Sequence, residues 1–238
     1  MNLAGGSTVL KVRVPRHPAN IVSGVLRTFI ALVSLGVCVG GVLDGGPVVM
    51  LAFTWQSNFM IAASFLWTAW ALFRDRRTPP EWLAGSAVFY IVITGLVYNF
   101  VISPGSFRVG NYVIAGLTGS DIAHVLIPVA AAVVWLVFEE HRRVPWRYIG
   151  LWLTYLVGYL VLIIGLISLV PGVRSPYPFL DVGVIGWAGV LEECLQLLIA
   201  FGSLAAIMVA TDHWMPPRTF ISEHDRFDEF NKRLAARA

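Results

Sequence analysis

The sequence predicts an all-α, polytopic membrane protein with six transmembrane helices and with both the N-terminus and the C-terminus on the cytoplasmic side. Composition is the first reason, because 57% of the 238 residues are hydrophobic and only 13% are charged, whereas soluble proteins carry roughly 25% charged residues. The mean hydropathy of +0.74 agrees with this. The other reasons are six long apolar runs and an alternation of basic residues between their connections. We therefore expect one membrane domain whose apolar surface mainly faces lipid.

The chain begins with a basic leader at residues 1–20, which we expect in the cytoplasm. The apolar run that follows has about 23 residues, and the apolar core of a signal peptide has only about 7–15. This run is therefore expected to remain as the first transmembrane helix. The predicted six-helix domain covers residues 21–210. Residues 211–238 form a cytoplasmic tail, which fits either an interfacial amphipathic helix or a frayed end.

Each of the six apolar runs reaches the roughly 20 residues that a transmembrane helix needs. The runs lie at 21–43, 48–73, 82–102, 117–138, 148–170 and 182–210. The connections between them carry proline or glycine, which end helices, at 44–47, 78–80, 103–105, 144–145 and 176–178. None of these connections is long enough to hold a second domain.

Basic residues cluster on alternate connections, and this sets the predicted orientation. They precede the first run, follow the second and fourth runs, and recur in the tail, while the remaining connections hold only Arg108 and Arg174. Because cytoplasmic connections are the ones enriched in lysine and arginine, both termini are expected inside. Six tryptophans also lie near the predicted cytoplasmic ends, where an indole ring can sit among lipid headgroups: Trp70, Trp82, Trp135, Trp146, Trp152 and Trp214.

Several classes of function are not indicated by the sequence. The basic residues, which bring the net charge to +3, follow membrane topology rather than a nucleic-acid groove, so we expect no nucleic-acid partner. Cys38 and Cys194 lie inside apolar runs without the spacing of a metal motif or a disulfide framework. His124 is the only histidine in an apolar run, which argues against a three-histidine zinc site. We expect no metal and no organic cofactor.

Polar residues gather at one predicted depth near the outer ends of the runs. Thr54 lies about six residues into the second run and His124 about seven residues into the fourth, which is roughly 10 Å deep at 1.5 Å per residue. Asn58 shares a helical face with Thr54, and Asp121 shares one with His124. A neutral imidazole near pH 7 can activate a hydroxyl nucleophile. Thr54 and His124 are therefore the candidate catalytic pair.

Supporting candidates surround this pair in the sequence. Asp121 could hold the imidazole tautomer, and Asn58, Gln56 or Tyr98 could donate hydrogen bonds to a developing oxyanion. Three further polar residues are expected close to the same layer, namely Asn99, Tyr177 and Asp181.

Each of these residues also has a purely structural interpretation. A lone threonine in a transmembrane helix usually bonds to its own backbone, and His124, Asn58 or Gln56 can act as hydrogen-bonding groups between helices. Asp121 also fits an N-cap or a first-turn acid of the fourth helix. Glu192 and Glu193 lie deep in the sixth run, so at least one of them is expected to face a partner or a wet cavity.

Three short motifs resemble a known family. They are residues 51–58 (LAFTWQSN), His124 with Pro128, and residues 177–181 (YPFLD). They are similar to motifs of the androgen-induced and androgen-dependent transmembrane proteins, six-helix threonine hydrolases that cleave fatty acid esters of hydroxy fatty acids (FAHFA). The resemblance puts the family's nucleophilic threonine on Thr54 and its essential histidine on His124, and it implies a bacterial-type relative. Val125 departs from the family pattern, in which a hydroxyl residue follows the histidine.

The leading hypothesis is an intramembrane lipid ester hydrolase in which Thr54 attacks the ester carbonyl and His124 takes and then returns the proton. The expected partners are membrane lipids and a lipid ester substrate that enters from the bilayer. The sequence does not indicate an oligomeric state. The excess of arginine over lysine is typical of a GC-rich bacterial coding sequence, and for a bacterial multi-pass protein we expect the plasma membrane.

Two other classes of function remain open at this stage. One is a small membrane transporter or lipid-binding bundle, with Glu192, Glu193 and Asp121 as proton or substrate groups. No internal repeat and no matching pair of broken runs supports a transporter. The other is a structural membrane subunit, for which the equal depth of Thr54 and His124 would be a coincidence.

Overall fold

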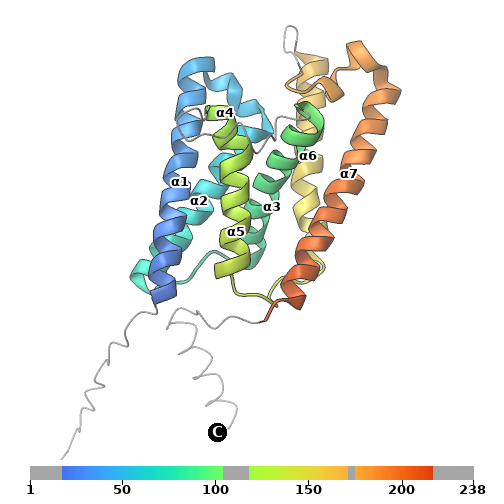
Figure 1. Cartoon of the computed structure of the whole chain (residues 1–238). Helices are drawn as coiled ribbons and strands as arrows, with labels where there is room; N and C mark the ends of the chain where they lie inside the picture. The colour runs from blue at the N-terminus through green and yellow to red at the C-terminus, as the bar shows by residue number, and fades with distance from the viewer. Residues whose placement is uncertain (1–17, 104–117, 171–174, 217–238) are drawn as a thin grey trace, which may run out of the picture.

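The computed structural model describes residues 18–103, 118–170 and 175–216, and within these ranges every regular element is a helix (Figure 1). The long helices are α1 (Pro18–Gly45), α2 (Phe53–Arg74), α3 (Glu81–Val97), α5 (Ile127–Phe138), α6 (Tyr148–Leu169) and α7 (Val182–Trp214). The short ones are α4 (Gly119–Asp121), the 3-10 turns Pro47–Leu51 and Pro178–Leu180, and the π-helical turns Tyr98–Ile102 and Ile122–Leu126. The all-α prediction is confirmed for the described residues. The predicted leader before residue 18, the tail beyond residue 216 and the residues Arg108 and Arg174 lie outside them.

Five helical segments of the described chain are long and apolar enough to cross a membrane. They are Pro18–Gly45, Glu81–Ile102, Gly119–Phe138, Tyr148–Leu169 and Val182–Trp214, and they correspond to five of the six predicted spans. These five helices indicate an integral membrane protein. The remaining predicted span, the second one at 48–73, contains α2. The first turns of α2 are more polar than the other spans, because they carry Thr54, Gln56, Ser57 and Asn58.

Four predicted spans contain breaks or changes of helix type that the apolar pattern did not predict. In the span at 82–102, α3 ends in the π-helical turn Tyr98–Ile102. The span at 48–73 starts as a 3-10 turn, and Ala52 (φ −75°, ψ 136°) separates that turn from α2. The span at 117–138 changes from α4 to a π-helical turn and then to α5. In α7, Gly186 has φ 68° and ψ 171°, a conformation that favours glycine, and it interrupts the helix near its start. The end of α7 differs as well, because the helix runs to Trp214 and not to residue 210.

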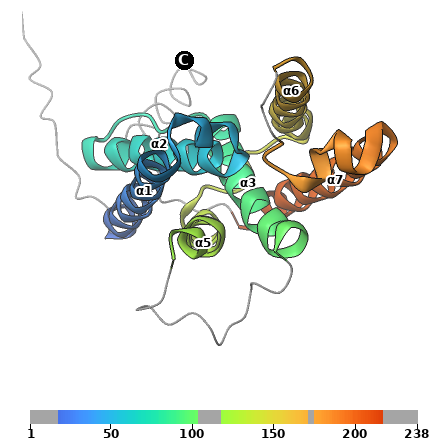
Figure 2. The same ribbon diagram turned by 90° about the horizontal axis from the view of Figure 1, so that it is seen from above.

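The helices α1, α2, α3 and α5 form one packed group, and α6 and α7 lie to the side of α3 (Figure 2). Two glycines of α1 bring α2 close, since Gly24 lies against the ring of Phe73 and Gly41 against the ring of Trp55. A methyl group at either glycine would overlap the ring, which is the way small residues allow membrane helices to approach. α7 packs mainly against α6 and the turn Pro178–Leu180, with few contacts to α3.

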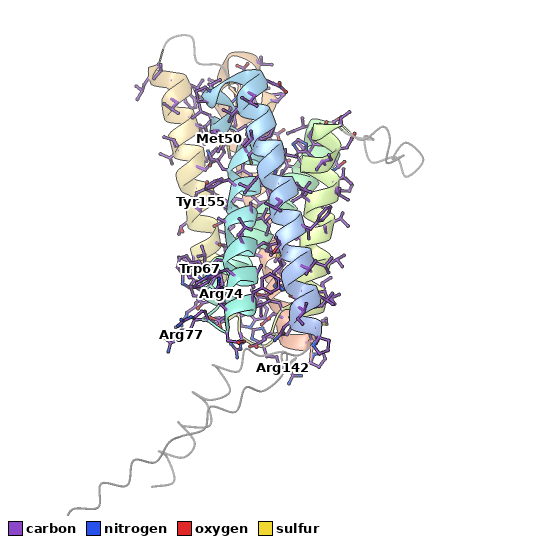
Figure 3. The ribbon with its side chains drawn as sticks, turned by 90° about the vertical axis from the view of Figure 1, so that its left-hand side faces the viewer. Met50, Trp67, Arg74, Arg77, Arg142 and Tyr155 are labelled. Atoms are coloured by element: carbon purple, nitrogen blue, oxygen red, sulfur yellow. The ribbon has the colours of Figure 1, made fainter. Side chains whose placement is uncertain are left out.

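Basic residues mark one end of the helix group. Figure 3 shows Arg74, Arg77 and Arg142 together at this end, which we call the basic end, and Met50 near the opposite end. α2 therefore starts near the opposite end and finishes at the basic end. This arrangement puts Thr54, the second residue of α2, far from the basic residues.

Candidate active site

The backbone of Thr54 is held by neighbouring polar side chains. Its carbonyl oxygen accepts hydrogen bonds from the Ser57 hydroxyl at 3.0 Å and from the Asn58 side-chain amide at 2.8 Å. Ser57 also contacts the Thr94 hydroxyl of α3 at 2.6 Å, and the Asn58 side-chain oxygen accepts a bond from Ser34 of α1 at 3.0 Å. Because these four partners are buried, Thr54 has a fixed position between α1 and α3.

The hydroxyl of Thr54 lies 3.2 Å from Nε2 of His124. The two side chains come from different helical segments, and both are half-buried. A separation of this size is within hydrogen-bonding distance for a nucleophile and its base in a site without substrate. The structure thus brings together the two residues that the sequence analysis paired.

The other ring nitrogen of His124 has a backbone partner. Nδ1 lies 2.8 Å from the carbonyl oxygen of Ser120 and 3.2 Å from the Ser120 hydroxyl. A carbonyl oxygen can only accept, so Nδ1 carries the hydrogen of the neutral ring. Nε2 then presents its lone pair to the Thr54 hydroxyl, which donates to it. This is the tautomer that a general base requires.

Pro128 changes the backbone around His124. Proline has no N–H, so the His124 carbonyl lacks its ordinary helical donor four residues on, and the chain forms the π-helical turn Ile122–Leu126 here. The side-chain amide of Asn99 donates to this carbonyl at 3.1 Å. Gly95 lies one turn before Asn99, and a methyl group there would be 2.9 Å from Pro128 Cβ and 3.1 Å from the His124 oxygen. Asn99 and Gly95 thus fix the backbone of His124 against α3.

Tyr98 holds the plane of the imidazole. Its ring stacks on the ring of His124 with centroids 3.8 Å apart and an interplanar angle of 17°. The Tyr98 hydroxyl accepts a hydrogen bond from the Ser120 hydroxyl at 3.0 Å. His124 is therefore confined by a stacked ring on one face and by a carbonyl at one edge.

An apolar cavity of about 370 Å³ lies beside Thr54. Its wall includes Thr54 and apolar residues of three helices, among them Ile93 of α3, Leu156 and Leu160 of α6, and Leu191 and Leu198 of α7. Cavities of a few hundred cubic ångströms with mainly apolar walls are the usual binding sites of small apolar ligands. The hydroxyl–imidazole pair is therefore next to a space that suits hydrocarbon.

Tyr177 reaches this region from the connection before α7. Its hydroxyl accepts a hydrogen bond from the backbone N–H of Phe53 at 2.8 Å, and the residue is only 9% exposed. Burial raises the pKa of the Tyr177 phenol, and hydrogen bonds to Tyr159, Phe53 and Thr54 oppose that rise. The phenol oxygen therefore lies against the first backbone N–H of α2, one residue before Thr54.

Within the described residues, the Asp121 carboxylate forms hydrogen bonds with Thr118 and none with His124. Its carboxylate accepts hydrogen bonds from the backbone N–H of Thr118 at 2.9 Å and from the Thr118 hydroxyl at 2.7 Å, and together they form a capping box. The role that we considered for Asp121 belongs instead to the Ser120 carbonyl. The structural interpretation of Asp121 as a first-turn acid fits these contacts.

Other supporting candidates also have structural partners. The Gln56 side chain donates to the Met50 carbonyl at 2.8 Å and accepts from the Tyr155 hydroxyl at 2.5 Å, which joins the turn before α2 to α6. Asp181 caps α7 by accepting from the backbone N–H of Gly183 at 3.0 Å. None of these hydrogen bonds of Gln56 and Asp181 involves Thr54 or His124.

Glu192 and Glu193 lie on α7 outside the cavity wall. Glu192 is exposed and accepts a hydrogen bond from Gln196 at 3.3 Å, and Glu193 is half-buried. Glu192 therefore has a hydrogen-bond partner, Gln196, in its own helix. The two carboxylates are separate from the Thr54–His124 pair.

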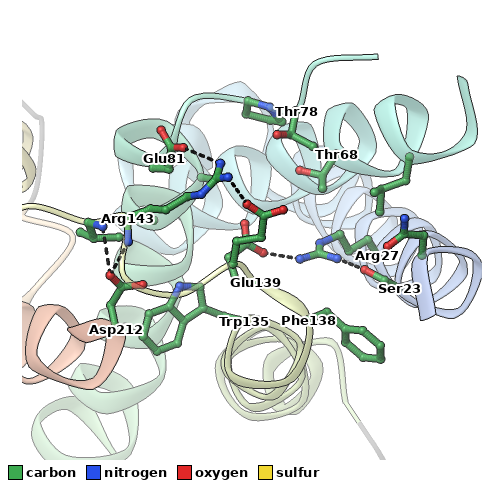
Figure 4. Close-up of a pocket in the computed structure, with 17 residues that line it drawn as sticks. Ser23, Arg27, Thr68, Thr78, Glu81, Trp135, Phe138, Glu139, Arg143 and Asp212 are labelled. Carbon is green, nitrogen blue, oxygen red and sulfur yellow. Dashed lines mark hydrogen bonds and ion pairs between the residues drawn. The ribbon is translucent and has the colours of Figure 1, made fainter. Parts of the chain in front are cut away.

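A second cavity, of about 70 Å³, lies at the basic end and has both polar and apolar residues in its walls (Figure 4). Arg27 of α1 is buried there, and its guanidinium donates to Ser23 and to the Glu139 carboxylate beyond α5. Arg143 pairs with Glu81 at 3.3 Å. These charges neutralise each other between helices, as polar groups commonly do inside a helix bundle. Sequence analysis did not single out Arg27, although its position inside the first apolar run was a usable signal.

Asp212 fastens α7 at this end. Its fully buried carboxylate accepts from the backbone N–H groups of Arg143 and Val144 at 3.0 Å each, and it lies 3.3 Å from Nδ1 of His141. α7 continues through Asp212 and ends at Trp214, beyond residue 210, where the predicted six-helix domain ends. The bonds of Asp212 join the end of α7 to the connection between α5 and α6.

Ser120 and Gly95 were missed by the sequence analysis. Pro128 was a usable signal for Asn99 only, because a proline four residues after a histidine leaves that histidine's carbonyl in need of another donor. Ser120 is one helical turn before His124, where its carbonyl can meet the ring.

Fold and site together define a helical membrane protein that carries a paired hydroxyl and imidazole beside an apolar cavity. Within the described residues, no three or more His, Cys, Asp or Glu side chains are grouped so as to hold a metal ion. Comparisons of the chain with protein-family models, with curated proteins and with solved structures find no match. The function proposed below therefore rests on the geometry of the site and on the three resembling motifs.

Proposed function

We propose that this protein is an intramembrane lipid ester hydrolase with Thr54 as nucleophile and His124 as general base. The observation that carries the proposal is the 3.2 Å contact between Thr54 Oγ1 and His124 Nε2 beside the apolar cavity. The Ser120 carbonyl supports it, because it leaves Nε2 free to accept the proton. The chemistry needs no metal or organic cofactor.

The reaction proceeds in two steps. In the first, Thr54 Oγ1 bonds to the ester carbonyl carbon, its proton moves to His124 Nε2, and the carbonyl electron pair moves to oxygen. Collapse of this intermediate breaks the ester C–O bond, and the leaving alkoxide takes the proton from Nε2. In the second step, water attacks the acyl-Thr54 ester with the same help from His124, and a carboxylic acid and free Thr54 result.

The proposed substrate is an ester with long hydrocarbon chains, as in FAHFA lipids. The cavity wall is almost entirely apolar and extends from Thr54 between α3, α6 and α7, so an acyl chain would lie there while its carboxyl end meets the hydroxyl. Burial of each methylene of such a chain contributes about 0.8 kcal/mol. Membrane lipids would enter this space from the side.

We propose a topology of six spans, with α2 as the second span and both termini in the cytoplasm. α2 has 22 residues, and at about 1.5 Å per residue this length crosses the roughly 30 Å of a hydrocarbon core. Its polar first turns would be covered by α1, α3 and the active-site cavity. The basic end then faces the cytoplasm, in keeping with the positive-inside rule, and the plasma membrane is the proposed location.

The test is hydrolysis of lipid esters by the purified protein in detergent. We expect wild type to release fatty acid and to react covalently with a fluorophosphonate at Thr54, and we expect Thr54→Ala and His124→Ala to lose both properties. Thr154→Ala and His213→Ala are matched controls, because each of these side chains bonds only to the carbonyl of its own helix in the described structure. Folded wild type without ester hydrolysis or labelling would overturn the proposal.

A lipid-binding bundle is the competing proposal, and the apolar cavity is the observation in its favour. The same variants separate the two proposals. A bundle that only binds lipid would bind a fluorescent fatty acid in the cavity. Wild type, Thr54→Ala and His124→Ala would then all fail to hydrolyse the ester.

A further inference from the structure

The hydroxyl of Tyr177 occupies the amino-terminal end of α2, one residue from the proposed nucleophile. It accepts from the backbone N–H of Phe53 at 2.8 Å. The first N–H groups of a helix have no carbonyl partner within that helix, so Tyr177 supplies the partner that Phe53 lacks. The Tyr177 phenol oxygen also lies at the positive end of the α2 helix dipole.

Tyr177 is close to the reacting hydroxyl as well as to the backbone. Its hydroxyl lies 2.8 Å from the backbone nitrogen of the residue before Thr54, and Tyr177 and Thr54 are both part of the wall of the apolar cavity. The Thr54 hydroxyl therefore has His124 Nε2 as its partner, while the Tyr177 phenol lies against the backbone of the preceding residue. A carbonyl carbon that Thr54 attacks would bring its oxygen to this neighbourhood.

The donors that sequence analysis considered for an oxyanion are used elsewhere. Asn58 is fully buried and bonds the Thr54 carbonyl and Ser34. Gln56 bonds Met50 and Tyr155. Tyr98 lies on the His124 side of the pair, stacked on the imidazole. Tyr98 and Tyr177 both line the cavity, but of these two only the Tyr177 hydroxyl is hydrogen-bonded at the start of α2, beside Thr54.

We propose that the Tyr177 hydroxyl is a catalytic residue that donates a hydrogen bond to the carbonyl oxygen of the ester as negative charge develops on it. The inference rests on the proposed hydrolase function and adds the missing oxyanion donor to it. No proton is transferred in this role, because the phenol keeps its hydrogen while the oxygen of the intermediate accepts the bond.

The surroundings of Tyr177 prepare its hydroxyl for this role. The Phe53 N–H donates to the phenol oxygen, and a hydroxyl that accepts one bond becomes a better donor of another. Its raised pKa keeps the phenol protonated near neutral pH, so that the hydrogen to be donated is present. The Tyr177 hydroxyl thus stays neutral while it donates the hydrogen bond to the intermediate.

The ring of Tyr177 is also held in place. It stacks on Phe179 with centroids 5.1 Å apart and an interplanar angle of 8°. Its backbone carbonyl accepts from the Ser175 hydroxyl at 2.7 Å and from the N–H of Leu180 at 3.1 Å. A donor in a fixed position needs little reorganisation when charge develops, which is the condition for oxyanion stabilisation.

The test compares Tyr177→Phe with wild type and with Tyr90→Phe. Tyr90 is a matched control because its buried hydroxyl also bonds to backbone, the Trp152 carbonyl at 2.9 Å, but it is not part of the cavity wall. For Tyr177→Phe we expect kcat for ester hydrolysis to fall by about 100- to 1,000-fold with little change in KM, the size seen when one oxyanion donor is removed. Tyr90→Phe should keep its kcat within about twofold.

A trifluoromethyl ketone with a long alkyl chain separates an oxyanion donor from a packing residue. Such a ketone forms a tetrahedral adduct with an active hydroxyl, whereas the corresponding alkyl ether does not. We expect Tyr177→Phe to weaken inhibition by the ketone about 100-fold or more and to leave binding of the ether unchanged. Equal weakening of both ligands, or a full kcat in Tyr177→Phe, would overturn the role of Tyr177 while the Thr54–His124 hydrolase stands. A wild type without hydrolysis would overturn both.

Discussion

At the scale of single residues, the imidazole of His124 is positioned by four different kinds of contact. A carbonyl bonds its Nδ1, a tyrosine ring stacks on its face, a hydroxyl meets its Nε2, and an amide satisfies its own backbone carbonyl. Only the last contact, from Asn99, is remote from the ring itself. Its role is therefore to position the backbone from which the imidazole extends.

Asn99 gives the prediction at this scale. In Asn99→Ala the His124 carbonyl loses its side-chain donor, and we expect kcat to fall by about 10- to 100-fold with KM nearly unchanged, since small displacements of a catalytic group cost rate rather than binding. Steady-state kinetics on a long-chain ester, with circular dichroism to verify folding, measure this.

Pro128→Ala supplies a sharper control for Asn99. Alanine at 128 restores a backbone N–H four residues after His124 and thus a helical donor for the same carbonyl. The loss caused by Asn99→Ala should therefore be smaller in the Pro128→Ala background than in wild type. Strictly additive losses in this double-mutant cycle would contradict the positioning role.

At the scale of elements, the contact between α3 and α5 decides whether the two halves of the pair meet. Gly95 permits this contact, because there is no room for a methyl group between α3 and the Pro128 ring or the His124 carbonyl. The obstructing atoms belong to a rigid ring and to backbone, so α5 itself would have to move. That movement would carry His124 away from Thr54.

Gly95→Ala is accordingly expected to destabilise the protein by about 1–3 kcal/mol, as overpacking in a closely fitted interior does, and to lower kcat. Gly158→Ala on α6 is the control, since nothing lies within 4 Å of the position of its added methyl group. Thermal unfolding in detergent and ester hydrolysis measure both effects. A Gly95→Ala protein as active and stable as Gly158→Ala would refute the close contact.

The sequence predicted the helical class, the approximate limits of the long helices and the pairing of Thr54 with His124. Apolar run length reports helices reliably in a membrane protein, because spanning segments must satisfy their backbone internally. It does not report the breaks at Ala52 and Gly186, which depend on single backbone conformations. Equal depth of Thr54 and His124 could be read from helical rise, whereas the use of the Ser120 carbonyl in place of Asp121 depends on ring orientation.

At the scale of the whole molecule, the apolar cavity is bordered by elements far apart in the sequence, among them α3, α6 and α7. Run-length analysis cannot predict such a space, because each helix contributes only a few side chains to it. Cys194 of α7 lies in its wall and is half-buried. A larger side chain there would shorten the space available to an acyl chain.

Cys194→Phe is therefore expected to lower kcat/KM for long-chain esters by about tenfold and to leave short-chain esters within about twofold, because the added ring excludes only the distal methylenes. A series of p-nitrophenyl esters of increasing chain length measures the change. Leu162→Phe is the control, since Leu162 is 51% exposed on α6 and is not in the cavity wall. An equal loss at all chain lengths would argue against the cavity as the acyl site.

The attachment of α7 has a consequence for the whole molecule. Asp212 ties one end of this helix to the connection between α5 and α6, and packing against the turn Pro178–Leu180 holds the other end. The part of α7 between these two attached ends borders the cavity. We therefore expect a lipid that enters from the bilayer to displace only this middle stretch of α7, while both ends of the helix stay attached.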